Sequence, residues 1–199
     1  MKLLITGSYG QLGNELTKIL KNGRAEIGEI SPAYSGCEII AVDYDALDIT
    51  DKDAVQAFIQ EHQPDIIFNC AAMTNVDQCE TDFETAMKVN AIGPRNLARA
   101  AKQTGAKLVH VSTDYVFSGT QATPRCEWDL CAPNTVYGKS KLLGERYAME
   151  QCPNTFVVRT AWLYGYVGKN FVKTMLRLGK EKEQVTVVND QHGNPTSAN

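Results

Sequence analysis

The stretch "KLLITGSYGQLG", residues 2–13, combines an apolar run with evenly spaced glycines. The run at 2–6 predicts a buried strand, and leucines and isoleucines at helical spacing follow it. Between the two patterns, Gly7, Gly10 and Gly13 recur at every third residue. Because such a turn lets backbone approach a pyrophosphate at a helix N-terminus, it predicts a dinucleotide site. The same glycines would also suit a tight turn with close helix–strand packing alone.

The rest of the chain repeats this alternation of strand and helix patterns. Further strands are predicted at residues 38–43, 65–70, 107–112, 155–160 and 185–188. Helices are predicted at residues 12–20, 50–64, 96–105, 137–150 and 170–178. Because repeated strand–helix–strand units favour right-handed crossovers, the predicted class is α/β: a Rossmann-like, doubly wound parallel sheet with helices on both faces. Residues 22–36, rich in glycine and serine, are predicted to be a surface insertion.

Composition and charge limit the kinds of binding partner and the cellular compartment that we expect for this protein. The 199 residues carry a net charge of −3 and no lysine–arginine cluster, so we expect no nucleic-acid partner. No apolar run reaches about 18 residues, and Gly7 comes too early for a signal peptide, so we expect a cytoplasmic protein without a membrane segment. The six cysteines form no Cys-x-x-Cys pair and the three histidines stand apart, so we expect reduced thiols and no metal site.

An acidic cluster follows the second predicted strand. Asp43, Asp45 and Asp48 each offer a carboxylate that could accept hydrogen bonds from the adenosine ribose. An acidic group there would repel a 2′-phosphate, which favours NAD weakly over NADP. For any one of the three, a solvated turn is an equally good interpretation.

One tyrosine–lysine pair has the spacing of a catalytic helix. Tyr137 and Lys141 are four residues apart and therefore lie on one helix face. The preceding strand ends in Ser112, Thr113 and Asp114, whose hydroxyls could hold a carbonyl oxygen or simply cap the strand. A nearby ammonium and a cationic nicotinamide are expected to lower the tyrosine pKa by about 1–3 units. Tyr137 is therefore predicted to donate a proton, and Lys141 to lower the pKa of that tyrosine.

Motifs along almost the whole chain resemble the extended short-chain dehydrogenase/reductases, and within them the dTDP-4-dehydrorhamnose reductases. The segments that carry the resemblance are "GSYGQLGNEL", "LDIT", "NCAAMTNVDQCE", "VNAIGPRNLARAAKQTGA", "VHVSTDYVFSG", "VYGKSKLLGE", "RTAWLYG", "NFVKTMLRL" and "VVNDQHGNPTSA". The resemblance implies NADPH- or NADH-dependent reduction of the 4-keto group of a nucleotide sugar, dTDP-4-dehydro-L-rhamnose, to dTDP-L-rhamnose. A homodimer is one form of assembly that it suggests.

The resemblance also implies roles for individual residues. The catalytic residues would be Thr113, which orients the carbonyl, Tyr137, which protonates its oxygen, and Lys141, which binds the nicotinamide ribose. Substrate would contact Thr113, Asp114 and Trp162. The cofactor would contact Tyr137, Lys141 and a further set: Gly7, Gly10, Gln11, Leu12, Gly13, Asp48, Ile49, Ala72, Met73 and Thr74. For the adenine side, this moves the expected contact from Asp43 to Asp48.

Members of this family are longer than 199 residues. We therefore expect an NAD(P)-binding Rossmann domain at 1–160. Residues 161–199 would begin a substrate-binding region, partly continuing the sheet, with the C-terminal substrate lobe largely missing. Two alternatives remain open: another nucleotide-sugar epimerase or dehydratase, and a non-catalytic NADP-binding regulatory subunit similar to the methionine adenosyltransferase beta subunit.

Overall fold

A computed structural model describes residues 1–121 and 123–199. Five parallel strands form the main sheet: β1 (Lys2–Thr6), β4 (Glu38–Val42), β5 (Ile66–Asn69), β6 (Lys107–Thr113) and β7 (Thr155–Thr160). Their order is β4-β1-β5-β6-β7. From β1 the chain goes first to one neighbour and then to the other, so the order of winding reverses between β1 and β5. In doubly wound sheets, ligands bind outside the strand ends at this switch.

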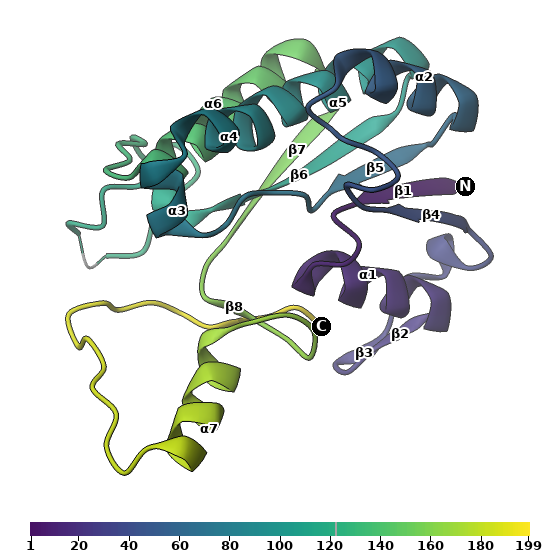
Figure 1. Cartoon of the computed structure of the whole chain (residues 1–199). Coiled ribbons are helices and arrows are strands. Elements are labelled where there is room, and N and C mark those ends of the chain that lie inside the picture. Colours follow the sequence, from purple (N-terminus) through teal and green to yellow (C-terminus); the bar gives the residue numbers. More distant parts are fainter. Residues whose placement is uncertain (122) are drawn as a thin grey trace.

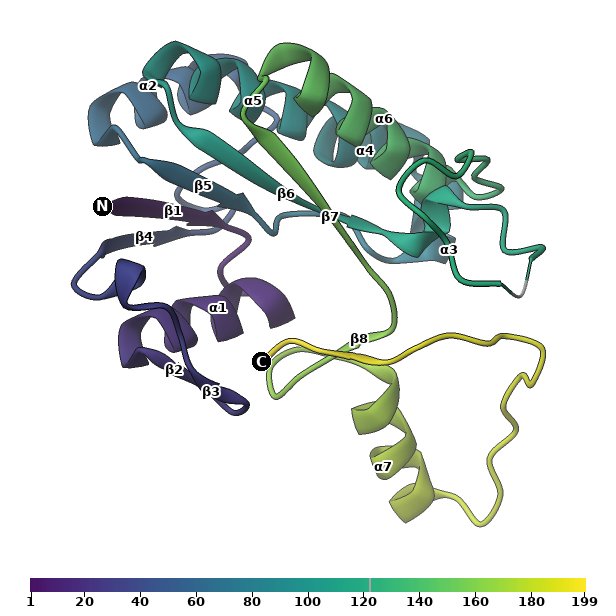
Figure 2. The same ribbon diagram turned by 180° about the vertical axis from the view of Figure 1, so that it is seen from behind.

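Helices cover both faces of this sheet, as Figure 1 shows. On one face lie α2 (Lys52–His62), α5 (Gly93–Thr104) and α6 (Val136–Gln151), and on the other lies α1 (Gln11–Asn22). The short helices α3 (Val76–Thr81) and α4 (Phe83–Met87) lead into a π-helical turn at Lys88–Ile92 before α5. The view from behind shows the same two layers (Figure 2). The predicted fold class is therefore confirmed.

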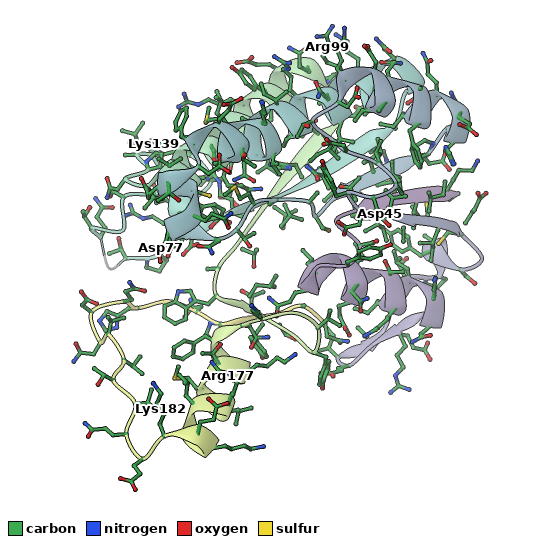
Figure 3. All side chains as sticks on the ribbon, in the orientation of Figure 1. Asp45, Asp77, Arg99, Lys139, Arg177 and Lys182 are labelled. Carbon is green, nitrogen blue, oxygen red and sulfur yellow. The ribbon has the colours of Figure 1, made fainter. Side chains whose placement is uncertain are left out.

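Two apolar clusters hold the layers together. Leu4, Ile67 and Leu108 face α2, α5 and α6, while Leu3 and Ile5 face α1. This division follows from the strand period of two, which sends successive side chains to opposite faces. The outer surface of the helical layer carries exposed charged side chains, among them Arg99 and Lys139, which Figure 3 labels.

Residues 22–36, predicted to be a surface insertion, also contribute to the core. They fold into a small hairpin, β2 (Arg24–Ala25) and β3 (Gly28–Glu29), and a 3₁₀ turn at Pro32–Tyr34. Ile30 and Tyr34 are partly buried and pack against the cluster beneath α1. The insertion therefore helps to close this side of the core.

The C-terminal segment forms a separate unit beside the N-terminal end of α1 (Figures 1 and 2). It contains β8 (Leu163–Tyr164), α7 (Phe171–Glu181) and β9 (Thr196–Ser197), and β8 pairs only with β9 among the described strands. The predicted strand at 185–188 is wrong, because these residues pair with no neighbouring strand in the described chain. Beyond residue 160, the described strands β8 and β9 pair with each other and not with the main sheet. The domain division at residue 160 stays a prediction.

Candidate active site

The glycine turn joins β1 to α1 in a way that only glycine permits. Gly7 has a φ of +69°, and a Cβ there would lie 2.6 Å from the Ala71 nitrogen. A Cβ on Gly13 would collide with the Gly7 carbonyl. Gly10 caps α1 without a side-chain hydrogen bond, and no acidic residue occupies the first helical turn. The uncapped N–H groups and the positive end of the helix dipole therefore suit a phosphate anion.

A smaller cleft of about 280 Å³ lies on the far side of this turn. Asp48 and Ile49, the residues predicted to flank the adenine, line it together with Gly7 and Asp43, and their contact with adenine stays a prediction. Asp43 accepts hydrogen bonds from the backbone N–H groups of Tyr9 at 2.8 Å and Tyr44 at 2.9 Å. Its carboxylate is thereby held at the rim of the cleft, so the residue first considered from the sequence also reaches this site.

A buried polar chain supports the turn from beneath. The Thr6 hydroxyl donates to Asn69 Oδ1 at 2.8 Å, and Asn69 Nδ2 lies 3.1 Å from His110 Nδ1. The chain crosses β1, β5 and β6, and all three side chains are buried. Burial, followed by the charge of Lys141, lowers the pKa of His110 well below its usual value. His110 is therefore neutral, and it stiffens the strand ends instead of carrying charge.

The main cleft has a volume of about 670 Å³ and brings the three predicted catalytic residues together. Thr113 comes from the end of β6, while Tyr137 and Lys141 come from the first turns of α6. Lys141 is 2% exposed, and its Nζ donates to the Val111 carbonyl at 2.7 Å. The Thr113 hydroxyl donates to Asp114 Oδ1 at 3.0 Å.

The Tyr137 pKa departs from the expectation drawn from the sequence. Burial raises it to about 12, and the nearby Thr113 hydroxyl opposes this shift only in part. Lys141 is not among the groups that shift it. Desolvation of the phenolate therefore outweighs the influences that lower this pKa. Tyr137 consequently holds its proton, as a proton donor must. The lowering expected with a cationic nicotinamide beside the ring stays a prediction.

Burial acts on Lys141 in the opposite sense. It lowers the Lys141 pKa from 10.5 to about 8, although the Glu145 carboxylate favours the charged form. An ammonium has three donors, and Val111 uses one of them. The remaining N–H groups are available to hydroxyls of a bound ligand.

Close backbone contacts fix α6 in place. A Cβ on Gly138 would collide with the Tyr115 carbonyl, and a Cβ on Gly144 would collide with the Asn90 carbonyl in the π-helical turn. Glu145 and Arg159 add a two-point ion pair to β7, with N–O distances of 2.6 and 2.9 Å. These contacts bring the helix that carries Tyr137 against the ends of the sheet.

Asn90 links the cofactor side of the cleft to the same helix. Its side chain exchanges two hydrogen bonds with the Met73 backbone, at 2.9 and 3.0 Å, and donates to the Ser140 hydroxyl at 3.1 Å. Met73 is the one residue of the set implied by the resemblance that lines neither cleft, and Asp45, a candidate from the sequence alone, also lies outside both. The structure instead ties its backbone to Asn90, while its neighbours Ala72 and Thr74 line the main cleft.

The other predicted residues all reach one of the two clefts. Gly10, Gln11, Leu12 and Gly13 line the main cleft at the glycine turn, and Asp114 and Trp162 line it together with the predicted catalytic residues. Trp162 has a φ of +51°, unusual for a bulky residue, and its ring meets Phe171 edge-on at 6.4 Å. Such strain is typical of functional positions.

Sequence reasoning missed several residues of the site. Tyr115 lines the main cleft, and its ring meets that of Tyr137 edge-on at 5.4 Å. Asn90 and Ser140 lie inside segments with ordinary helix patterns, and only their contacts reveal their positions. Within residues 1–121 and 123–199, no three histidine, cysteine or acidic side chains gather as a metal site would require.

The fold and the site together define a class: an α/β protein of the short-chain dehydrogenase/reductase type, with a Rossmann-like sheet and a Thr–Tyr–Lys set at the cleft. The family model described as the RmlD substrate binding domain matches residues 1–199. This chain belongs to that family.

Similar proteins carry reductase names. A dTDP-4-dehydrorhamnose reductase of Streptomyces griseus is 45% identical over 194 residues, 97% of this chain and 60% of the relative. The crystal structure of a dTDP-4-dehydrorhamnose reductase of Clostridium acetobutylicum is 48% identical, with a TM-score of 0.91, over 100% of this chain and 66% of that one. The enzyme of Bacillus anthracis, solved in complex with NADP, is 45% identical, with a TM-score of 0.88, over 99% and 66%. The chain thus spans about three fifths to two thirds of the length of these relatives.

Proposed function

We propose that this chain carries the cofactor site and the catalytic groups of a dTDP-4-dehydrorhamnose reductase, which reduces the 4-keto group of dTDP-4-dehydro-L-rhamnose to give dTDP-L-rhamnose. The observation that carries the proposal is the convergence of Thr113, Tyr137 and Lys141 on one cleft beside an uncapped helix N-terminus. NADPH or NADH is the proposed cofactor, in keeping with the NADP complex of the Bacillus anthracis relative.

Each residue of the site has a defined task. When bound, the reduced nicotinamide supplies the hydride. Tyr137 delivers a proton to the oxygen that becomes the 4-hydroxyl, and its raised pKa keeps that proton available. Thr113 orients the carbonyl oxygen once its hydroxyl turns away from Asp114, and Lys141 offers its free N–H groups to the nicotinamide ribose.

The substrate side is proposed at Asp114 and Trp162, which border the same cleft. Among the helices of the described residues, none has both the length and the apolar character needed to cross a bilayer. The proposal also includes three points drawn from composition and from the family resemblance: a cytoplasmic location, a homodimer and no nucleic-acid partner.

The test measures cofactor binding and turnover separately. NADPH and NADH are titrated against this chain by fluorescence. Oxidation of NADPH by dTDP-4-dehydro-L-rhamnose is then followed with this chain, and with a chimaera that joins it to the C-terminal third of the Clostridium acetobutylicum relative. We expect binding by both proteins and turnover that requires Tyr137. Binding without turnover by the chimaera would contradict the reductase proposal and favour a regulatory or other sugar-nucleotide role.

A further inference from the structure

The side chain of Gln11 leaves the cofactor turn and contacts a segment that is distant in sequence. Gln11 is the first residue of α1, directly after the glycine turn. Its Nε2 donates to the Leu163 carbonyl at 3.4 Å, and its Oε1 accepts from Asn170 Nδ2 at 2.8 Å. The backbone of Gln11 thus faces the predicted phosphate position, while its side chain holds the wall at 163–170.

The backbone of this wall packs closely around Gln11. Gly168 has a φ of +75°, and a Cβ there would lie 3.3 Å from Gln11 Cγ. At Gly165, a Cβ would lie 3.7 Å from Gln11 Oε1. The wall also borders the main cleft, which Trp162, Leu163 and Gly168 line together with Gln11.

Asn170 joins the parts of this contact. Its Nδ2 donates both to Gln11 and to the Gly165 carbonyl at 2.9 Å. Its Oδ1 accepts from the Lys173 N–H at 2.9 Å and so caps α7. One side chain therefore connects the cofactor turn, the wall and the start of the following helix.

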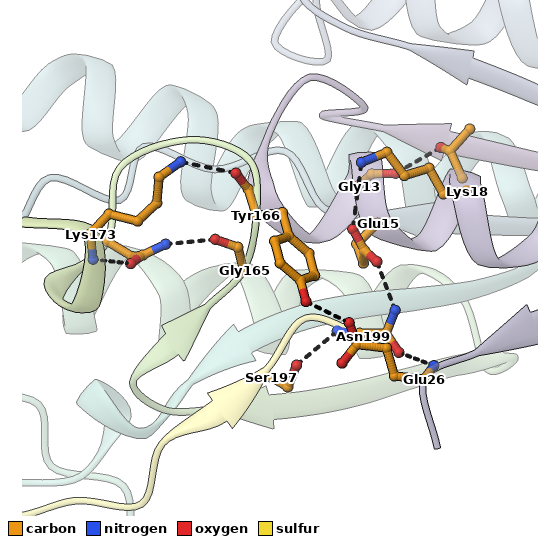
Figure 4. A network of polar contacts seen from close by, with 11 residues as sticks. Gly13, Glu15, Lys18, Glu26, Gly165, Tyr166, Lys173, Ser197 and Asn199 are labelled. Atoms are coloured by element: carbon orange, nitrogen blue, oxygen red, sulfur yellow. Dashed lines mark hydrogen bonds and ion pairs between the residues drawn. The ribbon is translucent and has the colours of Figure 1, made fainter. Parts of the chain in front are cut away.

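The same face of α1 makes a second contact one turn further on. Glu15 is four residues after Gln11, and its buried carboxylate accepts from Asn199 Nδ2 at 2.7 Å (Figure 4). Residues i and i+4 share a helix face, so α1 holds both ends of the C-terminal unit. The start of α1 is thus the element to which this unit is anchored.

We propose that Gln11 is a positioning residue that couples occupancy of the cofactor turn to the placement of the substrate wall at 162–170. The inference rests on the proposed function, namely that the turn holds the diphosphate of a nicotinamide cofactor. An anion bound to the N–H groups of α1 orders the first helical turn. Because the Gln11 side chain is hydrogen-bonded to Leu163 and Asn170, an ordered Gln11 also restricts the motion of these two residues. By linkage, a wall in place also favours the bound cofactor by the same factor.

Hydrogen exchange of backbone amides tests the coupling without any turnover. With wild-type chain, saturating NADPH should slow exchange at 7–13 and also at 163–170, the latter by about threefold or more. In Asn170→Ser the protection at 7–13 should remain and that at 163–170 should be lost, because serine keeps a hydroxyl that can cap α7 and is too short to reach Gln11. Gln11→Leu should also lose the protection at 163–170, although its backbone belongs to the predicted cofactor turn. Gln60→Leu, an exposed glutamine on α2, serves as the control and should match wild type.

The outcomes separate this inference from the proposed function. If NADPH still slows hydrogen exchange at 163–170 in both variants, the coupling is overturned and the proposed function is not. The same holds if, in the wild type, NADPH slows exchange at 7–13 but not at 163–170. The absence of any protection at 7–13 by NADPH or NADH overturns the proposed cofactor function, and the coupling with it. If Gln11→Leu does not fold, or no longer binds the cofactor, Asn170→Ser carries the test, since it lies outside the turn.

Discussion

Lys141 lies one helical turn beyond Tyr137 on α6, and its Nζ donates to the carbonyl oxygen of Val111 on β6 at 2.7 Å. The ammonium is thus anchored to the sheet, and burial, not this charge, sets the direction of the Tyr137 pKa shift. Burial favours the neutral form of both side chains: it raises the pKa of Tyr137 to about 12 and lowers the pKa of Lys141 to about 8. The tyrosine therefore keeps its proton over the whole physiological range, while the lysine loses its charge near pH 8.

The first prediction concerns the pH dependence of cofactor binding. The affinity for NADPH should be steady below pH 8 and fall above it, by at most about tenfold per pH unit, because Lys141 becomes neutral. For Lys141 alone, stability should move the other way: between about pH 8 and 10.5 the unfolded chain binds the proton that the folded chain has lost, so this residue's contribution to the free energy of unfolding rises with pH. Above about pH 9 the raised pKa of the buried Cys70 thiol contributes with the opposite sign, so the Lys141 contribution is the difference between the wild type and Lys141→Met. Fluorescence titration and urea unfolding across this range measure both.

Lys141→Met should remove both trends, whereas Lys139→Met, an exposed lysine on the same helix, should keep them. An NADPH affinity that stays constant up to pH 10 in the wild type would show that the Lys141 charge does not contribute to binding.

The second prediction concerns the proton donor. Tyr137→Phe keeps the ring and removes the hydroxyl, so kcat for the reductive reaction of the chimaera should fall by about 10²–10⁴-fold. Binding of NADPH should change little. Tyr115→Phe is the matched control, because its ring meets that of Tyr137 but its hydroxyl has no proposed role. Equal losses in the two variants would indicate damage to the aromatic packing instead of a lost proton.

The third prediction tests the close contact between α6 and the π-helical turn. Gly144→Ala should lower the free energy of unfolding by about 1–3 kcal/mol, because the added methyl group collides with the Asn90 carbonyl. Gly179→Ala lies in α7 with open space around it and should raise helix stability by about 0.5–1 kcal/mol. Urea unfolding of both variants gives the comparison, and equal effects would be inconsistent with the contact.

The fourth prediction concerns acid sensitivity. His110 is neutral in the folded protein, so below about pH 6.5 the unfolded chain takes up a proton that the folded chain refuses. The free energy of unfolding should therefore fall with decreasing pH, by at most about 1.4 kcal/mol per unit from this residue. His110→Gln keeps an acceptor for Asn69 and should flatten the slope. His192→Gln, an exposed control, should leave it unchanged, and parallel slopes for the wild type and His110→Gln would refute the assignment.

The fifth prediction concerns cofactor preference. Asp43 lines the smaller cleft, and none of the described residues that line it is a lysine or arginine. NADH should therefore bind more tightly than NADPH, since the carboxylate repels a 2′-phosphate. Asp43→Asn should lower the ratio of the NADPH and NADH dissociation constants by about two- to fivefold. Asp190→Asn, a distant exposed carboxylate, should leave that ratio unchanged. A wild-type preference for NADPH would contradict this account of the cleft.

Much of the architecture follows from local pattern. The glycine spacing after residues 2–6 and the tyrosine–lysine pair are short-range features, and the structure places them on the turn and the helix that they predict. The segment at 185–188 shows the limit of such reasoning. Its residues favour a strand, but a strand forms only where a neighbouring chain segment supplies hydrogen bonds, and among the described residues none does so here.

The sequence by itself predicted the five strands of the main sheet, the glycine turn and the tyrosine–lysine pair, because periodicity and spacing act over a few residues. The full set of Thr113, Tyr137 and Lys141 followed from the family resemblance and stays a proposal. Only the tertiary structure decided the pKa shifts of the site residues and the contacts between distant segments. The direction of the Tyr137 pKa shift depends on burial, which is set by α6 lying against β6. The contacts of Asn90 with Gly144 and of Gln11 with Asn170 join residues 54 and 159 positions apart. Such pairs depend on how the layers pack, and no local pattern encodes that packing.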